Sequence, residues 1–293
     1  MGAPEVARPG VDVSGACSHE AGHPLLENVI VLSNDRVAEG VGVIVLQSPR
    51  VAAAVRPGQF VHLRIAEGSD FILRRPFSVH RAEEGRIHIL YQVLGPGTRV
   101  LSEKWQGDKM DLIGPLGHGW QVPNGVAHAL LVAGGLGAAP LGMLAEELAR
   151  RGIAVTVAHG APTASRLVGR DVFEATARRV MTSTDDGSAG ERGLVTTLVE
   201  RALDAERPDV VYACGPEAMA RIVAAHAAGA DVPCQVSLER LMACGVGACL
   251  SCVVATTEGQ RRACVEGPVF DAERVIWDAT GIPPKHEESA WHL

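Results

Sequence analysis

The clearest chemical signature in this chain is a group of four cysteines close to its C-terminal end. They are spaced C-x4-C-x2-C-x11-C, at Cys244, Cys249, Cys252 and Cys264. The first three have the plant-type spacing with which thiolates hold a 2Fe–2S cluster. The residues between them are small, which suits a loop whose backbone N–H groups turn toward sulfur. The pattern predicts an iron–sulfur site. The alternatives are a structural zinc site, which more often has two CxxC pairs, and unrelated core cysteines.

The other cysteines carry weaker signals. Cys214 follows a predicted buried strand, where ligands bind in open α/β sheets. It therefore either lines a site or is a small buried residue, the common fate of a free cysteine. Cys234 is interpreted as buried, and Cys17 as incidental, because Cys17 lies in an aperiodic stretch rich in proline and glycine.

A glycine-rich loop lies between a buried strand at residues 129–133 and a helix expected from about residue 139 to residue 151. Its sequence is Gly134-Gly135-Leu136-Gly137-Ala138-Ala139-Pro140. Glycines let a backbone approach a phosphate, and the start of a helix supplies N–H donors. The loop does not match G-x-G-x-x-G, so a plain tight turn is the alternative.

A second candidate nucleotide segment is Arg75-Pro76-Phe77-Ser78. An arginine can grip a pyrophosphate with two hydrogen bonds, an aromatic ring can cover a flat ring, and a serine can hydrogen-bond either group. Gly97 and Thr98 follow in a G-P-G-T loop before a predicted helix. The alternative makes Arg75 a surface ion-pair partner and Phe77 a core residue.

Hydrophobic patterning divides the chain into parts that position these residues. Short β-branched runs separated by turns, with no strong helix before about residue 98, predict a small antiparallel barrel or sandwich. Strands then alternate with helices, which predicts a parallel sheet. The predicted fold class is therefore multidomain: a flexible N-terminal extension (1–25), an antiparallel β-barrel (26–123), an α/β parallel-sheet domain (124–234) and a small cysteine-rich module with a C-terminal tail (235–293).

Composition excludes several classes of function. The 293 residues carry a formal net charge of -7 and only 4% aromatic residues, which argues against a nucleic-acid partner. No stretch is apolar for long enough to span a bilayer, and no signal peptide is evident. We therefore expect a cytoplasmic protein with no membrane partner. In a reducing compartment, clustered cysteines favour metal or redox chemistry over disulfides.

The motifs R-P-F-S, G-x-G-T, G-G-L-G-A-A-P-L, C-G-P and the cysteine module occur here in an order that resembles the ferredoxin–NADP reductase-like superfamily. More narrowly, the chain resembles the electron-transfer subunits of NAD-dependent (class B) dihydroorotate dehydrogenases. The most specific stretch is 237–252, which reads S-L-E-R-L-M-A-C-G-V-G-A-C-L-S-C, and 264–270 and Trp277 continue it. The resemblance covers residues 28–277.

This resemblance implies three cofactor sites and no catalytic acid or base. The four module cysteines would ligate a 2Fe–2S cluster. The implied FAD-binding residues are Arg75, Pro76, Phe77, Ser78, Leu90, Tyr91, Gln92, Gly97 and Thr98. The implied NAD-side residues are Gly134, Gly135, Gly137, Cys214, Gly215 and Pro216. Gln92 stands where a basic residue is expected and Pro162 where relatives often have an arginine, so the preference between NAD and NADP stays open. The scattered histidines are interpreted as surface or structural residues.

The implied activity is electron transfer. A nicotinamide exchanges two electrons as a hydride, a 2Fe–2S cluster carries one electron, and a flavin can do both. The resemblance implies an oxidoreductase subunit that passes electrons from an FMN-containing, dihydroorotate-oxidising partner through the cluster and FAD to NAD⁺. It would act in pyrimidine biosynthesis, in a heterotetramer. One alternative is the same conduit serving another catalytic subunit, such as a sulfide or ferredoxin-linked reductase or a hydrogenase. Another is a non-enzymatic iron–sulfur or flavin regulatory module.

Overall fold

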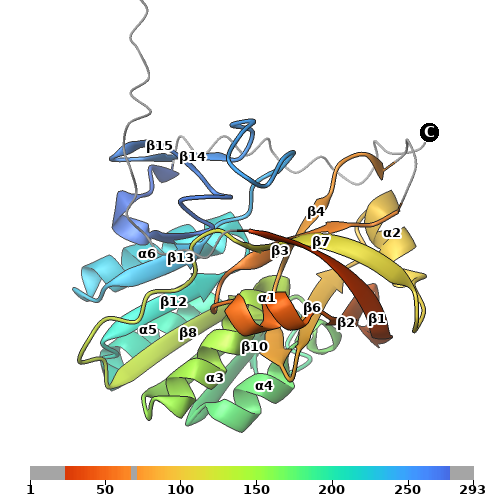
Figure 1. Ribbon diagram of the computed structural model, residues 1–293. Helices are drawn as coiled ribbons and strands as arrows, with labels where there is room; N and C mark the ends of the chain where they lie inside the picture. The colour runs from red at the N-terminus through yellow and green to blue at the C-terminus, as the bar shows by residue number, and fades with distance from the viewer. Residues whose placement is uncertain (1–23, 67–70, 278–293) are drawn as a thin grey trace, which may run out of the picture.

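The computed structural model describes residues 24–66 and 71–277. The predicted N-terminal extension, with Cys17, and the C-terminal tail lie outside these residues, apart from a few positions at their inner ends. Within the described residues the chain forms two large sheets and a small hairpin, with helices on the second sheet (Figure 1).

The first sheet is antiparallel, with strand order β4-β3-β7-β1-β2-β6-β5. Alternating residues of its strands point to one face and bury a core that includes Val31, Ile44, Leu63, Ile89 and Leu112. This confirms the predicted antiparallel barrel. Its strands are β1 (Leu25–Ala38), β2 (Val41–Gln47), β3 (Phe60–Arg64), β4 (Arg75–Ser78), β5 (Arg81–Glu83), β6 (Arg86–Gln92) and β7 (Lys109–Leu116).

Two short helices accompany this sheet, α1 (Pro49–Ala54) and α2 (Pro96–Ser102). The prediction of no strong helix before about residue 98 missed α1. The carboxylate of Glu27, on β1, accepts the N–H groups of Arg50 and Val51, both at 3.1 Å. A distant strand therefore satisfies donors that a helix start leaves unpaired, and local sequence does not reveal such a cap.

The second sheet has strand order β11-β10-β9-β8-β12-β13-β16 and is parallel except for β16. This confirms the predicted α/β sheet, although β10, β11 and α4 were not predicted. Its strands are β8 (His128–Gly134), β9 (Ala154–Ala161), β10 (Arg179–Thr184), β11 (Glu191–Arg192), β12 (Val210–Cys214), β13 (Cys234–Ser237) and β16 (Val269–Asp271). Its helices are α3 (Gly142–Arg150), α4 (Arg170–Thr176), α5 (Val195–Glu206) and α6 (Glu217–Gly229).

Strand order reverses at β8: β9, β10 and β11 extend to one side, β12 and β13 to the other. The crevice beyond the carboxyl ends of β8 and β12 is thus the topological switch point, where such sheets bind ligands. The α-helix expected from about residue 139 begins at Gly142 instead, after a 3-10 segment η2 (Gly135–Leu141). Pro140 lies in that segment and has no N–H to donate to an α-helical bond.

The cysteine-rich part lies between two neighbouring strands of the second sheet. β13 and β16 pair at Ser237 and Val269, so the chain leaves the sheet and returns beside its point of departure. Between them is the hairpin of β14 (Val253–Thr256) and β15 (Gly259–Arg262). Two further 3-10 segments are η3 (Ala164–Arg166) and η4 (Ala272–Arg274).

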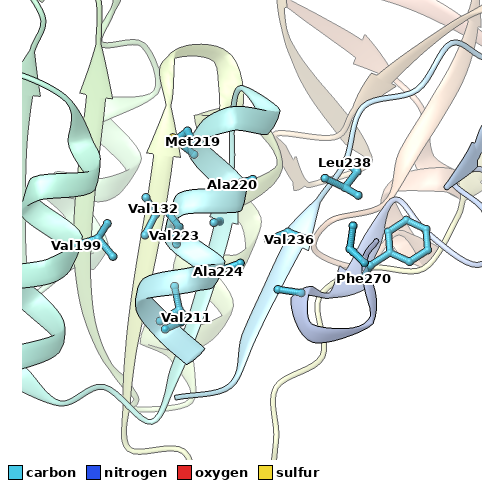
Figure 2. Packing of buried hydrophobic residues seen from close by; sticks show 14 of the residues in the cluster. Val132, Val199, Val211, Met219, Ala220, Val223, Ala224, Val236, Leu238 and Phe270 are labelled. Atoms are coloured by element: carbon cyan, nitrogen blue, oxygen red, sulfur yellow. The ribbon is translucent and has the colours of Figure 1, made fainter. Parts of the chain in front are cut away.

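One hydrophobic core joins the three parts. Phe60 from the barrel, Val223 from α6, and Val254 from the hairpin belong to the same buried cluster. Figure 2 shows the α6 residues of this cluster packed over β8 and β12, with Val236 and Phe270 beside them. Among the described helices, none is long and apolar enough to cross a membrane.

Candidate functional site

The glycine loop and the C-G-P segment meet at the switch point. Gly134 ends β8, and its neighbour Ala133 pairs with Cys214 at the end of β12. A Cβ added to Gly137 would overlap the carbonyl oxygen of Cys214. One added to Gly134 would lie 2.9 Å from Cδ of Pro216. The two segments therefore touch backbone to backbone, and only glycine fits between them.

Gly135 differs from its neighbours. Its φ is +54°, in the left-handed region, and within the described chain a Cβ there would meet no atom within 4 Å. Its backbone therefore borders open space at the start of a helical segment, where N–H groups attract anions. Of the predicted NAD-side residues, the structure brings together Gly134, Gly135, Gly137, Cys214, Gly215 and Pro216.

The thiol of Cys214 belongs to the α/β core, and its burial raises its pKa to about 12. The thiol is therefore neutral at neutral pH, and the backbone of Cys214 contacts the glycine loop. Cys234, at the start of β13, is half-buried by exposure, and burial raises its pKa to about 12 as well.

In the barrel, the R-P-F-S segment forms β4, an edge strand whose four residues are all half-buried. Nε of Arg75 lies 3.4 Å from the position of a Cβ on Gly97. Thr98 Oγ1 accepts the N–H groups of Leu94 (2.9 Å) and Gly95 (3.2 Å) and so begins α2. The two predicted flavin segments therefore meet where the Arg75 guanidinium lies beside Gly97, at the start of α2. The guanidinium and the N–H groups of the helix start are hydrogen-bond donors that fit a pyrophosphate.

The third predicted flavin segment, on β6, divides between two faces. The Tyr91 ring packs in the barrel core, and its hydroxyl donates to Oδ1 of Asn34 (2.9 Å). Leu90 packs instead with Ala139 from the glycine loop, between the barrel and the α/β domain. Gln92 is half-buried. The side chain of Tyr91 therefore does not join those of Leu90 and Gln92.

The cysteine loop, residues 238–268 between β13 and β16, carries four thiols that form two pairs of contrasting exposure. Cys252 and Cys264 are both buried and stand at the two ends of the β14–β15 hairpin, whose pairing begins at Val253 and Arg262. The eleven intervening residues are the hairpin and its connection to Cys264, which explains the C-x11-C spacing. Cys244 is half-buried and Cys249 is exposed.

The sulfur atoms of Cys244 and Cys249 have polar neighbours within the loop. Sγ of Cys244 accepts the N–H of Val246 (3.5 Å), and Sγ of Cys249 lies 3.2 Å from Oγ of Ser251. Hydrogen bonds from Ser251 lower the pKa of Cys249 to about 6, whereas burial raises that of Cys264 to about 12. No group of three or more His, Cys, Asp or Glu in the described ranges is placed to hold a single metal ion. Free thiols in a loop with inward N–H donors fit a 2Fe–2S cluster.

Two arginines fix the ends of the loop, Arg240 with a side chain only 7% exposed and Arg262 with a side chain 35% exposed. Nη1 of Arg240 donates to Oε2 of Glu217 (3.0 Å), the first residue of α6 after C-G-P. Nη1 of Arg262 donates to the carbonyl of Gly247 (3.2 Å), and its guanidinium pairs with Glu266. Arg240 thus ties the cysteine loop to the NAD side. In the sequence, only its position within the 237–252 stretch that carries the family resemblance marked Arg240.

Two buried histidines join the parts, and sequence reasoning did not single them out. His80 follows β4, and its Nδ1 lies 3.0 Å from the carbonyl oxygen of Ala139. Burial lowers its pKa. His62, on β3, lies against Gly245 of the cysteine loop. Each stands alone in the sequence, so no spacing pattern could have found it.

Two family models match the chain in the regions just described. One, for the iron-sulfur cluster binding domain of dihydroorotate dehydrogenase B, matches residues 239–276. The other, for an oxidoreductase NAD-binding domain, matches residues 131–225. The first covers the cysteine loop and the second the glycine loop and the C-G-P segment.

Curated relatives match most of the chain. The dihydroorotate dehydrogenase B (NAD(+)) electron transfer subunit of Desulforamulus reducens is 41% identical over 254 residues, which cover 85% of this chain and 97% of the relative. The protein with the same name from Geobacillus thermodenitrificans is 38% identical over 257 residues, which cover 85% and 98%.

Solved structures share the fold. A chain from the structure of an NADH-dependent reduced ferredoxin-NADP oxidoreductase superposes with a TM-score of 0.79 at 34% identity, covering 86% of this chain and 91% of that chain. A ferredoxin NADP+ reductase from Neisseria gonorrhoeae, solved with FAD and NADP, gives a TM-score of 0.59 at 16% identity, covering 70% and 91%. At that identity the second similarity concerns the fold alone.

Proposed function

We propose a function from the premise that this chain belongs to the family of dihydroorotate dehydrogenase B (NAD(+)) electron transfer subunits. It carries electrons from a dihydroorotate-oxidising partner to NAD⁺ in pyrimidine biosynthesis. The observation that carries this proposal is the position of the cysteine loop. It leaves the sheet next to β12, which ends in C-G-P, and it packs on β3, next to the R-P-F-S strand.

Each cofactor has a set of residues suited to it. For FAD these are Arg75, Pro76, Phe77, Ser78, Leu90, Gln92, Gly97 and Thr98, and the backbone of Tyr91. For NAD they are the glycine loop and C-G-P, and for the 2Fe–2S cluster the four loop cysteines. Bound FAD supplies the change between two-electron exchange with a nicotinamide and one-electron exchange with a cluster. The chain's residues bind and orient these groups, and no side chain here acts as a general base.

The catalytic partner would dock over the cysteine loop. Three apolar side chains stand exposed there, Leu241 (80%), Val246 (46%) and Leu250 (62%), next to the exposed Cys249. A group of exposed apolar side chains is typical of a protein–protein contact. We propose that this surface receives an FMN-containing α/β barrel, in a heterotetramer of two copies of each subunit, in the cytoplasm.

The test uses the tagged chain, purified anaerobically from its own cells together with its partner. Addition of dihydroorotate and NAD⁺ should produce NADH, and Cys249→Ser should abolish that production. The same variant should keep NADH-driven bleaching of the flavin absorbance, because that step needs only the barrel and the α/β domain. If an intact complex makes no NADH from dihydroorotate, the assignment of the pathway is wrong.

A second candidate is the same conduit serving a ferredoxin-linked reductase. The 34% identity to a chain of the NADH-dependent reduced ferredoxin-NADP oxidoreductase favours it. It predicts that the copurified partner lacks dihydroorotate oxidation while NADH still reduces the flavin. A regulatory module without activity predicts neither reaction.

A further inference from the structure

His62 occupies the junction between the proposed flavin strand and the cysteine loop. It lies on β3, where it pairs with Pro76 of the R-P-F-S strand on one side and with Ile113 of β7 on the other. Its neighbours Val61 and Leu63 point into the barrel core. Because side chains alternate along a strand, His62 points away from that core.

The ring of His62 meets the loop at its first ligand. Gly245 follows Cys244 and has a φ of +70°. A Cβ on Gly245 would overlap Nδ1 of His62 and would lie 2.9 Å from its Cε1. The Cys244–Gly245 peptide is therefore in direct contact with the imidazole, and residue 245 must be glycine for that contact to exist.

His62 is fully buried, yet within the described residues neither ring nitrogen has a hydrogen-bond partner. The backbones of Cys244 and Arg74 approach the ring without forming a hydrogen bond in the structure. A buried polar group without a partner costs free energy, and a phenylalanine would fill this place without that cost. The unpaired N–H therefore requires an explanation.

We propose that His62 is a positioning residue for the iron–sulfur cluster. Its ring packs against the Cys244–Gly245 peptide and holds it in place, and its unpaired N–H would donate a hydrogen bond to a sulfur atom of the bound cluster. Hydrogen bonds to cluster sulfur are one of the means by which a protein sets the reduction potential. The same residue flanks the proposed flavin strand, so it fixes the cluster loop relative to that strand. This inference rests on the proposed cluster ligation by the loop cysteines.

The first test compares His62→Phe with the wild-type complex by redox titration of the cluster, followed by EPR. Removal of a hydrogen bond to sulfur should shift the midpoint potential to more negative values. His62→Gln, which keeps an N–H donor, should restore part of the shift. The matched control is His159→Phe, because His159 is also fully buried, with both ring nitrogens unpartnered in the described chain, but lies on β9. The midpoint potential of the cluster in His159→Phe should equal that in the wild type.

The second test does not use His62→Phe, so it decides the question even if that variant does not fold. The wild-type complex is labelled with 15N only in histidine, and its reduced cluster is studied by pulsed EPR. A weak 15N coupling is expected, and it should disappear in His62→Gln. That loss distinguishes His62 from His118, whose Nδ1 lies 2.9 Å from the carbonyl of Val265.

The outcomes separate this inference from the function it rests on. A wild-type chain without iron or a cluster signal contradicts the proposed function itself. A cluster with no histidine 15N coupling, or an unchanged potential in fully loaded His62→Phe, overturns the role of His62 alone. A shift of equal size in His159→Phe also overturns it, because the effect would then come from general loss of packing.

Discussion

The NAD-side crevice and the cysteine loop differ in how far contacts between protein atoms already fix their geometry. In the crevice, Gly137 touches the backbone of Cys214, and residues 129–133 of β8 and 210–214 of β12 below it are buried. In the loop, backbone turns through Gly245 and Gly247, at φ of +70° and +85°, present thiols that range from exposed to buried. Protein contacts alone therefore fix the NAD side, whereas we expect the loop to need its ligand for full order, as metal-binding segments commonly do.

The largest effect should come from Cys264→Ser, which removes a buried ligand at the base of the hairpin. We expect loss of cluster iron and a fall of more than about 100-fold in electron transfer from the partner to NAD⁺, because loss of a ligand costs more than loss of an outer-shell contact. NADH-driven bleaching of the flavin should persist, because the crevice does not depend on the cluster. Iron analysis and stopped-flow absorbance measure both, with Cys234→Ser as the control. If flavin reduction is lost too, the two regions are not separable.

Gly245→Ala should act on the loop more mildly. A non-glycine residue at this φ costs about 1 kcal/mol or more, and the added Cβ overlaps His62. We expect a protein that binds less than one cluster per chain and retains its NADH reaction. Iron content and visible absorbance provide the readout. Full cluster loading in this variant would show that the loop adapts to the lost contact.

Glu217→Ala tests the connection between the two regions. Arg240 is only 7% exposed in its side chain, and two of its nitrogens already lack partners in the described chain. Removal of its carboxylate leaves a buried unpaired charge, at a cost of about 3 kcal/mol in the free energy of unfolding. Denaturant titration measures this cost.

Two variants control for that measurement. Glu146→Ala breaks the more exposed pair with Arg81 and should cost less than about 1 kcal/mol. The double variant Glu217→Ala with Arg240→Met should recover part of the loss, since no charge is left buried. A double variant as unstable as Glu217→Ala alone would argue against an electrostatic cause.

Gly137→Ala addresses the crevice. The new Cβ would overlap the Cys214 carbonyl oxygen, so the glycine loop must move away from β12. A displacement that costs about 1.4 kcal/mol of binding energy raises KM for NADH about tenfold. Cluster content should not change. Gly229→Ala at the end of α6, where a Cβ meets no described atom within 4 Å, is the control and should leave KM unaltered.

The effect that is smallest at neutral pH concerns acid stability on the NAD side. Burial lowers the pKa of His159 from 6.5 to about 4. Below pH 6.5 the unfolded chain binds a proton that the folded chain does not, so stability falls by at most about 1.4 kcal/mol per pH unit down to about pH 4. His159→Phe should flatten this decline and change nothing through titration at pH 7. Urea titrations across this range measure it, with His226→Phe, at a half-buried position on α6, as the control.

Sequence patterns predicted those parts of the candidate site that lie within a few residues of one another. The cysteine spacing indicated a compact thiol loop, and the glycine run indicated a close backbone approach between a strand and a helix. Contacts between distant segments left no such pattern. His62, His80 and Arg240 act through neighbours that the fold brings to them, as Glu27 does when it caps α1. Their roles follow from burial and pairing, which single residue types do not encode.

The strands β13 and β16 on either side of the cysteine loop have a consequence for electron transfer. Both belong to the α/β sheet, and the hairpin between them shares one buried core with α6 and the barrel. Both ends of the cluster-binding segment are therefore fixed in the sheet, unlike those of a carrier held by a flexible tether. Transfer within this chain should consequently be insensitive to solvent viscosity, with donor and acceptor at one fixed tunnelling distance throughout turnover.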